Sequence, residues 1–249
     1  MKIISPDDLI PINLFESDFP ILVNLIYAQK DHPDNHFGQL YHPKTFLLWL
    51  HKDLARIILR ASQMGSELFG WTLDLLDGLR PVEAQREMSK FSIPWQMLAR
   101  PGQGGHPRAM AVDIFPRDHD GNKLEMGTAF DQFVENYGQD INYADRSITD
   151  FGKSLKDNLE IWQNRGKLTY LMLEAARQFD HEILPLPHEW WDYRLPKELS
   201  DQYAPLKESD LYPFQRLISP DIEQCQKIKK EVIPEEIKNN IKAIYETLS

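Results

Sequence analysis

Apolar residues return every three or four positions in two long stretches of the chain. The first, over residues 42–68, predicts an amphipathic helix with Pro43 near its start. The second predicts a helix over residues 166–179, where one face is apolar. The apolar positions of the first stretch are Phe46, Leu47, Leu50, Leu54, Ile57, Ile58 and Ala61.

Shorter apolar runs lie between these helices. "WTLDLLDG" (71–78) predicts a strand that ends at Gly78, and "AMAVDIF" (109–115) predicts a buried strand followed by a turn in "RDHDGN". A further helix is expected in "PVEAQREMSKF", with Pro81 in its first turn, and "EWWDYRL" (189–195) is expected to be extended. Helices before and between short strands favour an α+β fold over a regular βαβ repeat.

The character of the chain changes near residue 200. A connector with several prolines leads to a last predicted helix after Pro234. We therefore expect a main domain over residues 1–200 and a C-terminal extension over residues 201–249. The apolar stripe of the last helix is expected to pack on this chain rather than on a partner. Its members are Ile237, Ile241, Ile244 and Leu248.

Composition narrows the class of partner. The chain has 249 residues, 42% of them hydrophobic, and a formal net charge of -10. Without a dense Lys/Arg block, this charge argues against nucleic acid or an anionic membrane as the main partner. No apolar run reaches the roughly 20 residues needed to span a bilayer. Acids and prolines interrupt the N-terminus where a signal peptide needs an apolar run, so a cytoplasmic location is expected.

Cys225 is the one cysteine of the sequence, which excludes an internal disulfide. It lies in the charged run "EQCQKIKKE". The sequence therefore predicts an incidental thiol on the surface or in the tail.

Three polar clusters lie beside the predicted strands. Asp113 is the most informative member, because a carboxylate within an apolar run is costly unless a cation or hydrogen-bond donors satisfy it. On a helix, His106 and Asp113 would be separated by about 10 Å, too far to share one ion. They can converge if "PGQGG" forms a flexible loop that leads into a strand. The clusters are Asp77 with Arg80, His106 with Asp113, and Glu189 with Asp192.

Taken in order, these segments resemble the VanX-type zinc D-alanyl-D-alanine dipeptidases, within the zinc D,D-peptidase family whose fold is shared with Hedgehog domains. The resemblance covers about residues 22–196. It rests on "DGLRP", "GGHPRAMAVD", "MGTAFD" and "EWWD", which appear in the same order as the family's segments "D-x-[YF]-R-P", "S-x-H-x-x-G-x-A-x-D", "M-G-x-x-F-D" and "E-W-W-H".

The resemblance implies a Hedgehog-like α+β fold with an antiparallel sheet and packed helices. It also implies one Zn²⁺ ion per chain, held by His106, Asp113 and the residue at position 192. Glu189 would be the general base, and Arg80 would stabilise the transition state. The pair Trp190–Trp191 is interpreted either as a rigid wall of the site or as ordinary core.

This chain departs from the family at several positions of the motifs. Asp192 replaces the third ligand, a histidine, and a second carboxylate would favour harder metals such as manganese. His188 is an alternative ligand, although Asp192 holds the family register. Residues 189 and 192 would point to opposite faces of a regular strand, so an irregular backbone is expected there. Gly104 replaces the serine expected to hold the substrate's terminal carboxylate, and Ala109 replaces the motif glycine.

The sequence thus predicts metal-dependent hydrolysis of a short peptide, D-alanyl-D-alanine or a related D,D-dipeptide of cell-wall peptidoglycan. A second hypothesis is a degenerate member that binds a peptide or protein without cleaving it. Retention of Glu189 speaks against that hypothesis, and the loss of the third histidine speaks for it. A cell-wall carboxypeptidase is disfavoured because no export signal is seen.

Overall fold

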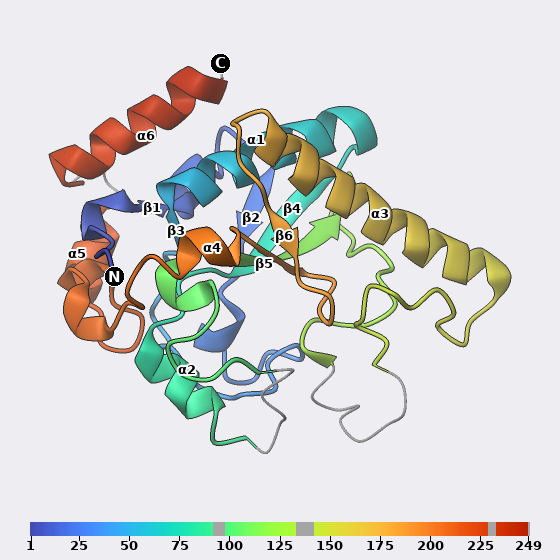
Figure 1. Cartoon of the computed structure of the whole chain (residues 1–249), viewed down its shortest axis with the longest axis horizontal. Coiled ribbons are helices and arrows are strands. Elements are labelled where there is room, and N and C mark those ends of the chain that lie inside the picture. The colour runs from blue at the N-terminus through green and yellow to red at the C-terminus, as the bar shows by residue number, and fades with distance from the viewer. Residues whose placement is uncertain (92–97, 133–141, 229–232, 249) are drawn as a thin grey trace.

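A computed structural model describes residues 1–91, 98–132, 142–228 and 233–248 (Figure 1). The helices of this part are α1 (Lys52–Phe69), α2 (Val82–Met88), α3 (Leu155–Arg177), α4 (Lys197–Ser200), α5 (Ile222–Ile228) and α6 (Glu235–Leu248). The strands are β1 (Leu9–Pro11), β2 (Ile21–Val23), β3 (Trp49–His51), β4 (Thr72–Asp77), β5 (Ala111–Arg117), β6 (Leu184–Pro185) and β7 (Asp192–Arg194).

The main sheet has the strand order β2-β4-β5-β7-β6. Strands β4, β5, β7 and β6 pair antiparallel, as predicted, whereas β2 is parallel to β4, so the sheet is mixed. Strands β1 and β3 form a separate antiparallel pair. The observed fold is a mixed architecture of helices and sheets, compatible with the α+β class.

The predicted strands at 71–78 and 109–115 are confirmed as β4 and β5, and the segment after Pro81 forms α2. The helix predicted over 166–179 is also present, although α3 is longer and begins at Leu155. The prediction of one helix over 42–68 was wrong at its start. Residues Trp49–His51 are extended because they pair with β1, and the His51 side chain caps the first turn of α1.

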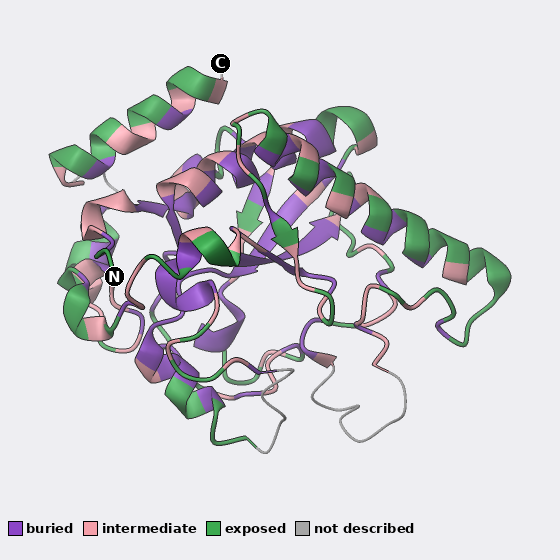
Figure 2. Cartoon of the chain, in the orientation of Figure 1, coloured by how far each residue is buried: buried purple, intermediate pink, exposed green. Residues whose placement is uncertain are grey.

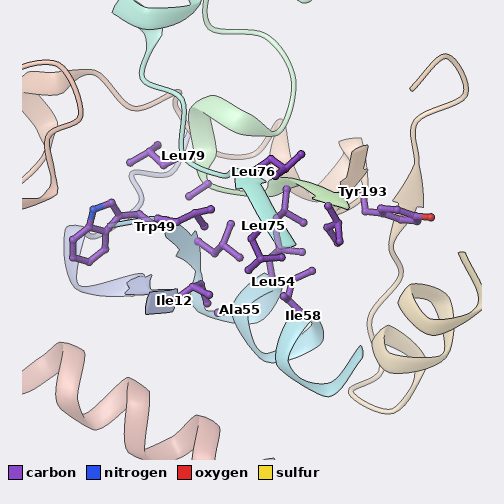
Figure 3. Packing of buried hydrophobic residues seen from close by; sticks show 14 of the residues in the cluster. Ile12, Trp49, Leu54, Ala55, Ile58, Leu75, Leu76, Leu79 and Tyr193 are labelled. Carbon is purple, nitrogen blue, oxygen red and sulfur yellow. The ribbon is translucent and has the colours of Figure 1, made fainter. Parts of the chain in front are cut away.

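Helix α1 packs on one face of the main sheet. Figure 3 shows Leu54 and Ile58 of α1 beside Leu75 of β4. Neighbouring residues of a strand point to opposite faces, and Leu75 pairs with Ile114, so Asp113 projects from the other face. The sheet therefore carries its apolar core on one side and polar chemistry on the other.

Residues beyond 200 share the core of the preceding chain. Leu206, Leu217 and Ile244 belong to the same hydrophobic cluster as the residues of β4 and β5. Helix α6 packs on α1 and β1, which confirms that its apolar stripe docks on this chain. Cys225 is buried in α5, so the prediction of a surface thiol was wrong. The division of the chain at residue 200 stays a prediction.

Figure 2 shows that buried residues concentrate in the sheet and on the inner faces of α1 and α3. None of the described helices has the length and apolar character required to cross a bilayer.

The burial of α6 generates a stability prediction. Ile237 is fully buried, whereas Ile3 is 82% exposed. Ile237→Ala should lower the free energy of unfolding by about 2–5 kcal/mol, because it leaves a cavity where α6 buries this side chain. Ile3→Ala, the same chemical change at the surface, should alter it by no more than about 0.5 kcal/mol. Urea denaturation measures both, and equal effects would show that α6 is not part of the cooperative core.

Candidate metal centre

Three aspartates lie in one row across neighbouring strands. Asp77 of β4 is in register with Asp113 of β5, and Asp113 is in register with Asp192 of β7. A shift of register between Leu75 and Asp77 brings Asp77 into this row. All three side chains are buried. Like charges on facing strands repel one another, so this row requires cations between or beside its members.

His106 lies against this row. It opens a short 3-10 helix (His106–Arg108) after the loop that contains Gly104 and Gly105. A Cβ atom on Gly105 would lie 2.8 Å from the Cβ of Ala111, so glycine lets this loop pack directly on β5. The predicted arrangement of loop followed by strand is confirmed, and it brings His106 beside Asp113.

The imidazole of His106 is oriented by a backbone carbonyl. Nδ1 lies 2.8 Å from the oxygen of Gly78, which suits a hydrogen bond donated by Nδ1–H. Nε2 then faces the carboxylates, 3.5 Å from Oδ1 of Asp113 and 3.3 Å from Oδ2 of Asp192. Metal-binding histidines are held in this way, with one ring nitrogen on a carbonyl and the other free to bind.

Asp113 supplies a direct test of whether a metal fits. Its Oδ1 is buried and accepts no hydrogen bond from any residue of the described ranges. Donor atoms of a tetrahedral ion with bonds of about 2.0–2.1 Å lie about 3.3–3.4 Å apart. The separations of His106 Nε2 from the two carboxylate oxygens, 3.5 and 3.3 Å, match this spacing. The distances from His106 to each of the two carboxylates therefore suit a divalent metal.

Two overlapping groups of donors have ligand atoms close enough to share an ion: Asp77 with His106 and Asp113, and Asp113 with Glu189 and Asp192. Asp77 is less available to an ion because Arg80 holds it. Nε of Arg80 donates a hydrogen bond to Asp77 Oδ2 at 2.8 Å, and Nη2 of Arg80 lies 2.7 Å from the same oxygen. Nδ1 of His106, the ring nitrogen nearer to Asp77, is already engaged by Gly78. Asp192 is likewise held by Arg194, so the ring nitrogens of His106 decide between the two sides. Nε2 has no carbonyl partner and faces Asp113 and Asp192, so His106 offers its free nitrogen on that side.

Arg80 is a buried guanidinium that lines the same cavity. Asp77 holds it from one side, and the ring of Tyr27 lies 5.1 Å from its central carbon. Asp77 is in turn fixed by the hydroxyl of Tyr41, which donates to Oδ1 at 2.7 Å. Arg80 also lies 3.4 Å from Oδ2 of Asp113. Its position is set by these contacts, so it can meet a developing negative charge without rearranging.

Glu189 lies in a turn that immediately precedes β7. The backbone nitrogen of Asp192 lies 3.3 Å from the carbonyl of Glu189, which closes this turn. The expected irregular backbone is therefore confirmed, and it lets Glu189 and Asp192 line one cavity. Burial, followed by the charges of Asp192 and Asp113, raises the pKa of Glu189 well above its ordinary value.

His188 lies apart from the row of carboxylates. Its side chain is half exposed, and Nδ1 lies 2.8 Å from Oδ2 of Asp145. Trp190 and Trp191 are fully buried, with their rings edge to face at 5.3 Å. The two tryptophans thus belong to the core and also support the turn that carries Glu189.

Arg194 was not identified from the sequence. Its Nε donates to Oδ1 of Asp192 at 2.8 Å, and its Nη2 bonds Oδ2 of the same carboxylate. Burial raises the pKa of Asp192, but Arg194 and His106 outweigh burial and hold that pKa well below its usual range. The available signal was position, because residues 192 and 194 of a strand share a face.

Asp131 and Tyr27 were also missed. The hydroxyl of Tyr27 donates to Oδ2 of Asp131 at 2.6 Å, and both side chains line the cavity. Burial raises the pKa of Asp131 to about 8, against the opposing effect of this hydrogen bond. The signal for Asp131 was its place at the end of "MGTAFD".

The resulting cavity has a volume of about 110 Å³ and strongly charged walls. Burial and Arg80 lower the pKa of His106, but Asp113 and Asp192 raise it, and the net result is about 10. The site therefore favours a positive charge at Nε2, whether a proton or a metal ion. Such an arrangement can hold a cation, orient a polar substrate and exchange a proton through Glu189.

Comparison with known proteins adds one relative. The chain is 27% identical over 199 residues to the D-alanyl-D-alanine dipeptidase of Escherichia coli (strain K12). The matched region covers 75% of this chain and 88% of that enzyme. No family model matches the chain. A distant relative is thus a dipeptidase, and the buried group of Asp77, His106 and Asp113 could hold a metal ion.

Metal titration of point variants tests the ligand assignment. Asp192→Ala should weaken binding of Zn²⁺ or Mn²⁺ by at least about tenfold, since it removes a donor next to His106 Nε2. His188→Ala, which changes a side chain bonded to Asp145, should leave affinity within about twofold.

Asp77→Asn separates the two overlapping donor groups in the same titration. It should retain metal, because Asp77 serves Arg80 and not the ion. Loss of metal in Asp77→Asn with retention in Asp192→Ala would place the ion on the other side of His106.

Proposed function

We propose that this chain is a metal-dependent peptidase that hydrolyses short peptides, with His106, Asp113 and Asp192 as the metal ligands. The observation that carries the proposal is the orphaned Oδ1 of Asp113, 3.5 Å from His106 Nε2 and beside a second carboxylate. The distant dipeptidase relative supports the reaction class. We further propose that the fold belongs to the D,D-peptidase type with its Hedgehog-like sheet.

The metal, when bound, would acidify a water molecule and polarise the peptide carbonyl. Zn²⁺ suits the imidazole, and the two carboxylates also accept Mn²⁺. Asp192 replaces a neutral histidine of the resembling family, which by itself would reduce the positive charge of the centre. Arg194 offsets this change, because its guanidinium pairs with both oxygens of Asp192. The Asp192–Arg194 pair is formally neutral, like the histidine that it replaces.

Glu189 is the group that would move the proton. It is partly exposed in the cavity, and its raised pKa allows the carboxyl to hold a proton between the attack of water and the departure of the amine. The turn before β7 places Glu189 close enough to Asp113 and Asp192 to share an ion with them. Its role requires that it start each cycle ionised, which a bound cation in the site favours.

Arg80 would stabilise the negative charge that grows on the carbonyl oxygen of the substrate. Asp77 and Tyr27 fix its guanidinium at the wall of the cavity. A preorganised donor costs no reorganisation at the moment of reaction, and this is the main advantage of such groups.

The substrate is proposed to carry a free carboxylate, which Arg194 binds. A Cβ atom on Gly104 would lie 3.7 Å from Nη1 of Arg194, so the guanidinium occupies the neighbourhood of the family's serine. Asp192 takes one edge of the guanidinium, through Nε and Nη2. The five N–H groups of arginine leave donors on the other edge for a second carboxylate. D-alanyl-D-alanine and related dipeptides in the cytoplasm fit this requirement.

One observation favours the alternative function, binding of a peptide without cleavage. The bidentate pairing of Arg194 with Asp192 places a positive charge directly against a proposed ligand. If that pairing replaces the metal, the cavity would bind a charged peptide and leave it intact. Metal content and turnover together distinguish the two functions.

Glu189→Gln tests the proposed chemistry. It should keep the metal and lower turnover of dipeptides by about 10²–10⁴, because it removes proton transfer and no ligand. Glu182→Gln, the same change at an exposed residue, is the control and should retain parental turnover. A loss below about tenfold would exclude Glu189 as the base.

Arg194→Gln tests the carboxylate site. The parent should prefer a dipeptide over the same dipeptide with a C-terminal amide by about 10- to 100-fold in kcat/KM. Arg194→Gln should reduce this preference to near unity, whatever its effect on metal affinity, because only the acid presents the charge. Lys197→Gln removes a charge from the wall of the adjoining cavity and should keep the preference. An unchanged preference in Arg194→Gln would contradict the assignment.

A further inference from the structure

Helix α3 carries a stripe of exposed apolar side chains, which we call the α3 stripe. It consists of Leu155, Leu159, Trp162, Tyr170 and Leu173. The opposite face of α3, with Leu168 and Leu171, is buried against the protein. Figure 2 shows the outer face of α3 exposed along its length. The α3 stripe is separate from the candidate metal centre, whose lining includes no residue of α3.

Four of the five residues of the α3 stripe are arranged symmetrically about Gly166. Leu159 and Leu173 lie seven residues before and after this glycine, and Trp162 and Tyr170 lie four residues before and after it. All of these positions share one face, because three, four and seven residues are close to whole turns of a helix. A stripe with this symmetry is complementary to itself when a second copy runs antiparallel.

Gly166 is the residue at the centre of the stripe. Glycine is unfavourable inside a helix, and a Cβ atom at Gly166 would meet nothing within 4 Å. No described part of the protein therefore requires the absence of a side chain here. A close approach by a second helix backbone would require it.

Charges beside the stripe obey the same symmetry. Lys156 and Glu174 are eighteen residues apart, which is five full turns, so they lie on the same side of α3. In an antiparallel pair centred on Gly166, Lys156 of one copy lies about two residues from the level of Glu174 of the other. Glu174 also holds Arg177 of its own helix through two hydrogen bonds, so in the pair it would lie between two positive side chains, Arg177 of its own copy and Lys156 of the other.

We propose that α3 is a self-association surface, on which two copies of this chain pair through antiparallel α3 helices crossing at Gly166. Two copies of the α3 stripe present on the order of 1,000 Å² of apolar surface, near the lower limit for a specific interface. An interface of this size is expected to be weak, so the dimer should be in equilibrium with the monomer. The antiparallel arrangement places Trp162 of each copy against Tyr170 of the other and Leu159 against Leu173.

Sedimentation velocity of the full chain over a range of concentrations tests the surface. The parent should show a monomer–dimer equilibrium, and Trp162→Glu should raise its dissociation constant by at least about thirtyfold. Leu173→Glu should act in the same direction. Leu22→Glu is the matched control, since Leu22 and Leu173 are both leucines with 45% exposure and Leu22 lies on β2. A parent that stays monomeric, or a dimer that survives Trp162→Glu, would overturn the proposal.

Disulfide trapping tests the orientation of the two helices in the pair. The parent, whose native Cys225 is buried, gives the background level of cross-linking. Gly166→Cys should form a disulfide-linked dimer under mild oxidation, because residue 166 faces its own copy at the crossing. Leu159→Cys alone should not, whereas Leu159→Cys combined with Leu173→Cys should. Efficient trapping by Leu159→Cys alone would show a parallel pair and contradict the antiparallel one.

Discussion

Three buried aspartates in register across β4, β5 and β7 impose the main physical constraint on this protein. Asp77, Asp113 and Asp192 occupy facing positions where like charges destabilise a sheet. The fold supplies positive groups around the row, and each has a defined partner. Arg80 serves Asp77, Arg194 serves Asp192, and the central Asp113 keeps one oxygen without a hydrogen bond from the described residues. That remaining oxygen points to a cation as the missing partner.

The sequence predicted the parts of this arrangement that depend on local signals. Asp113 was identified because a carboxylate in an apolar run needs a partner, and His106 because a glycine loop precedes it. Features that depend on distant pairing could not be predicted. The start of α1 was misplaced because residues 49–51 pair with β1, which lies about forty positions earlier in the sequence. Arg194 is different, because its partner Asp192 is two residues away on the same face of β7 and this local position could have identified it.

Two of the departures from the resembling family, Asp192 and Gly104, lie in one neighbourhood. Asp192, Arg194 and Gly104 lie around one end of the cavity. The carboxylate of Asp192 is paired with the guanidinium of Arg194, and Gly104 lies beside that guanidinium. Asp192 and Arg194 therefore act together, and replacing one of them alone would leave an unpaired buried charge.

The central claim is that a divalent ion binds between His106, Asp113 and Asp192. X-ray absorption at the K-edge of bound zinc tests it most directly, because the spectrum distinguishes imidazole, oxygen and sulfur donors. The account predicts one ion per chain with a single imidazole, the remaining donors being oxygen, and loss of the imidazole signal in His106→Ala. A spectrum with two imidazoles or with sulfur, or a protein that binds no divalent ion, would contradict it.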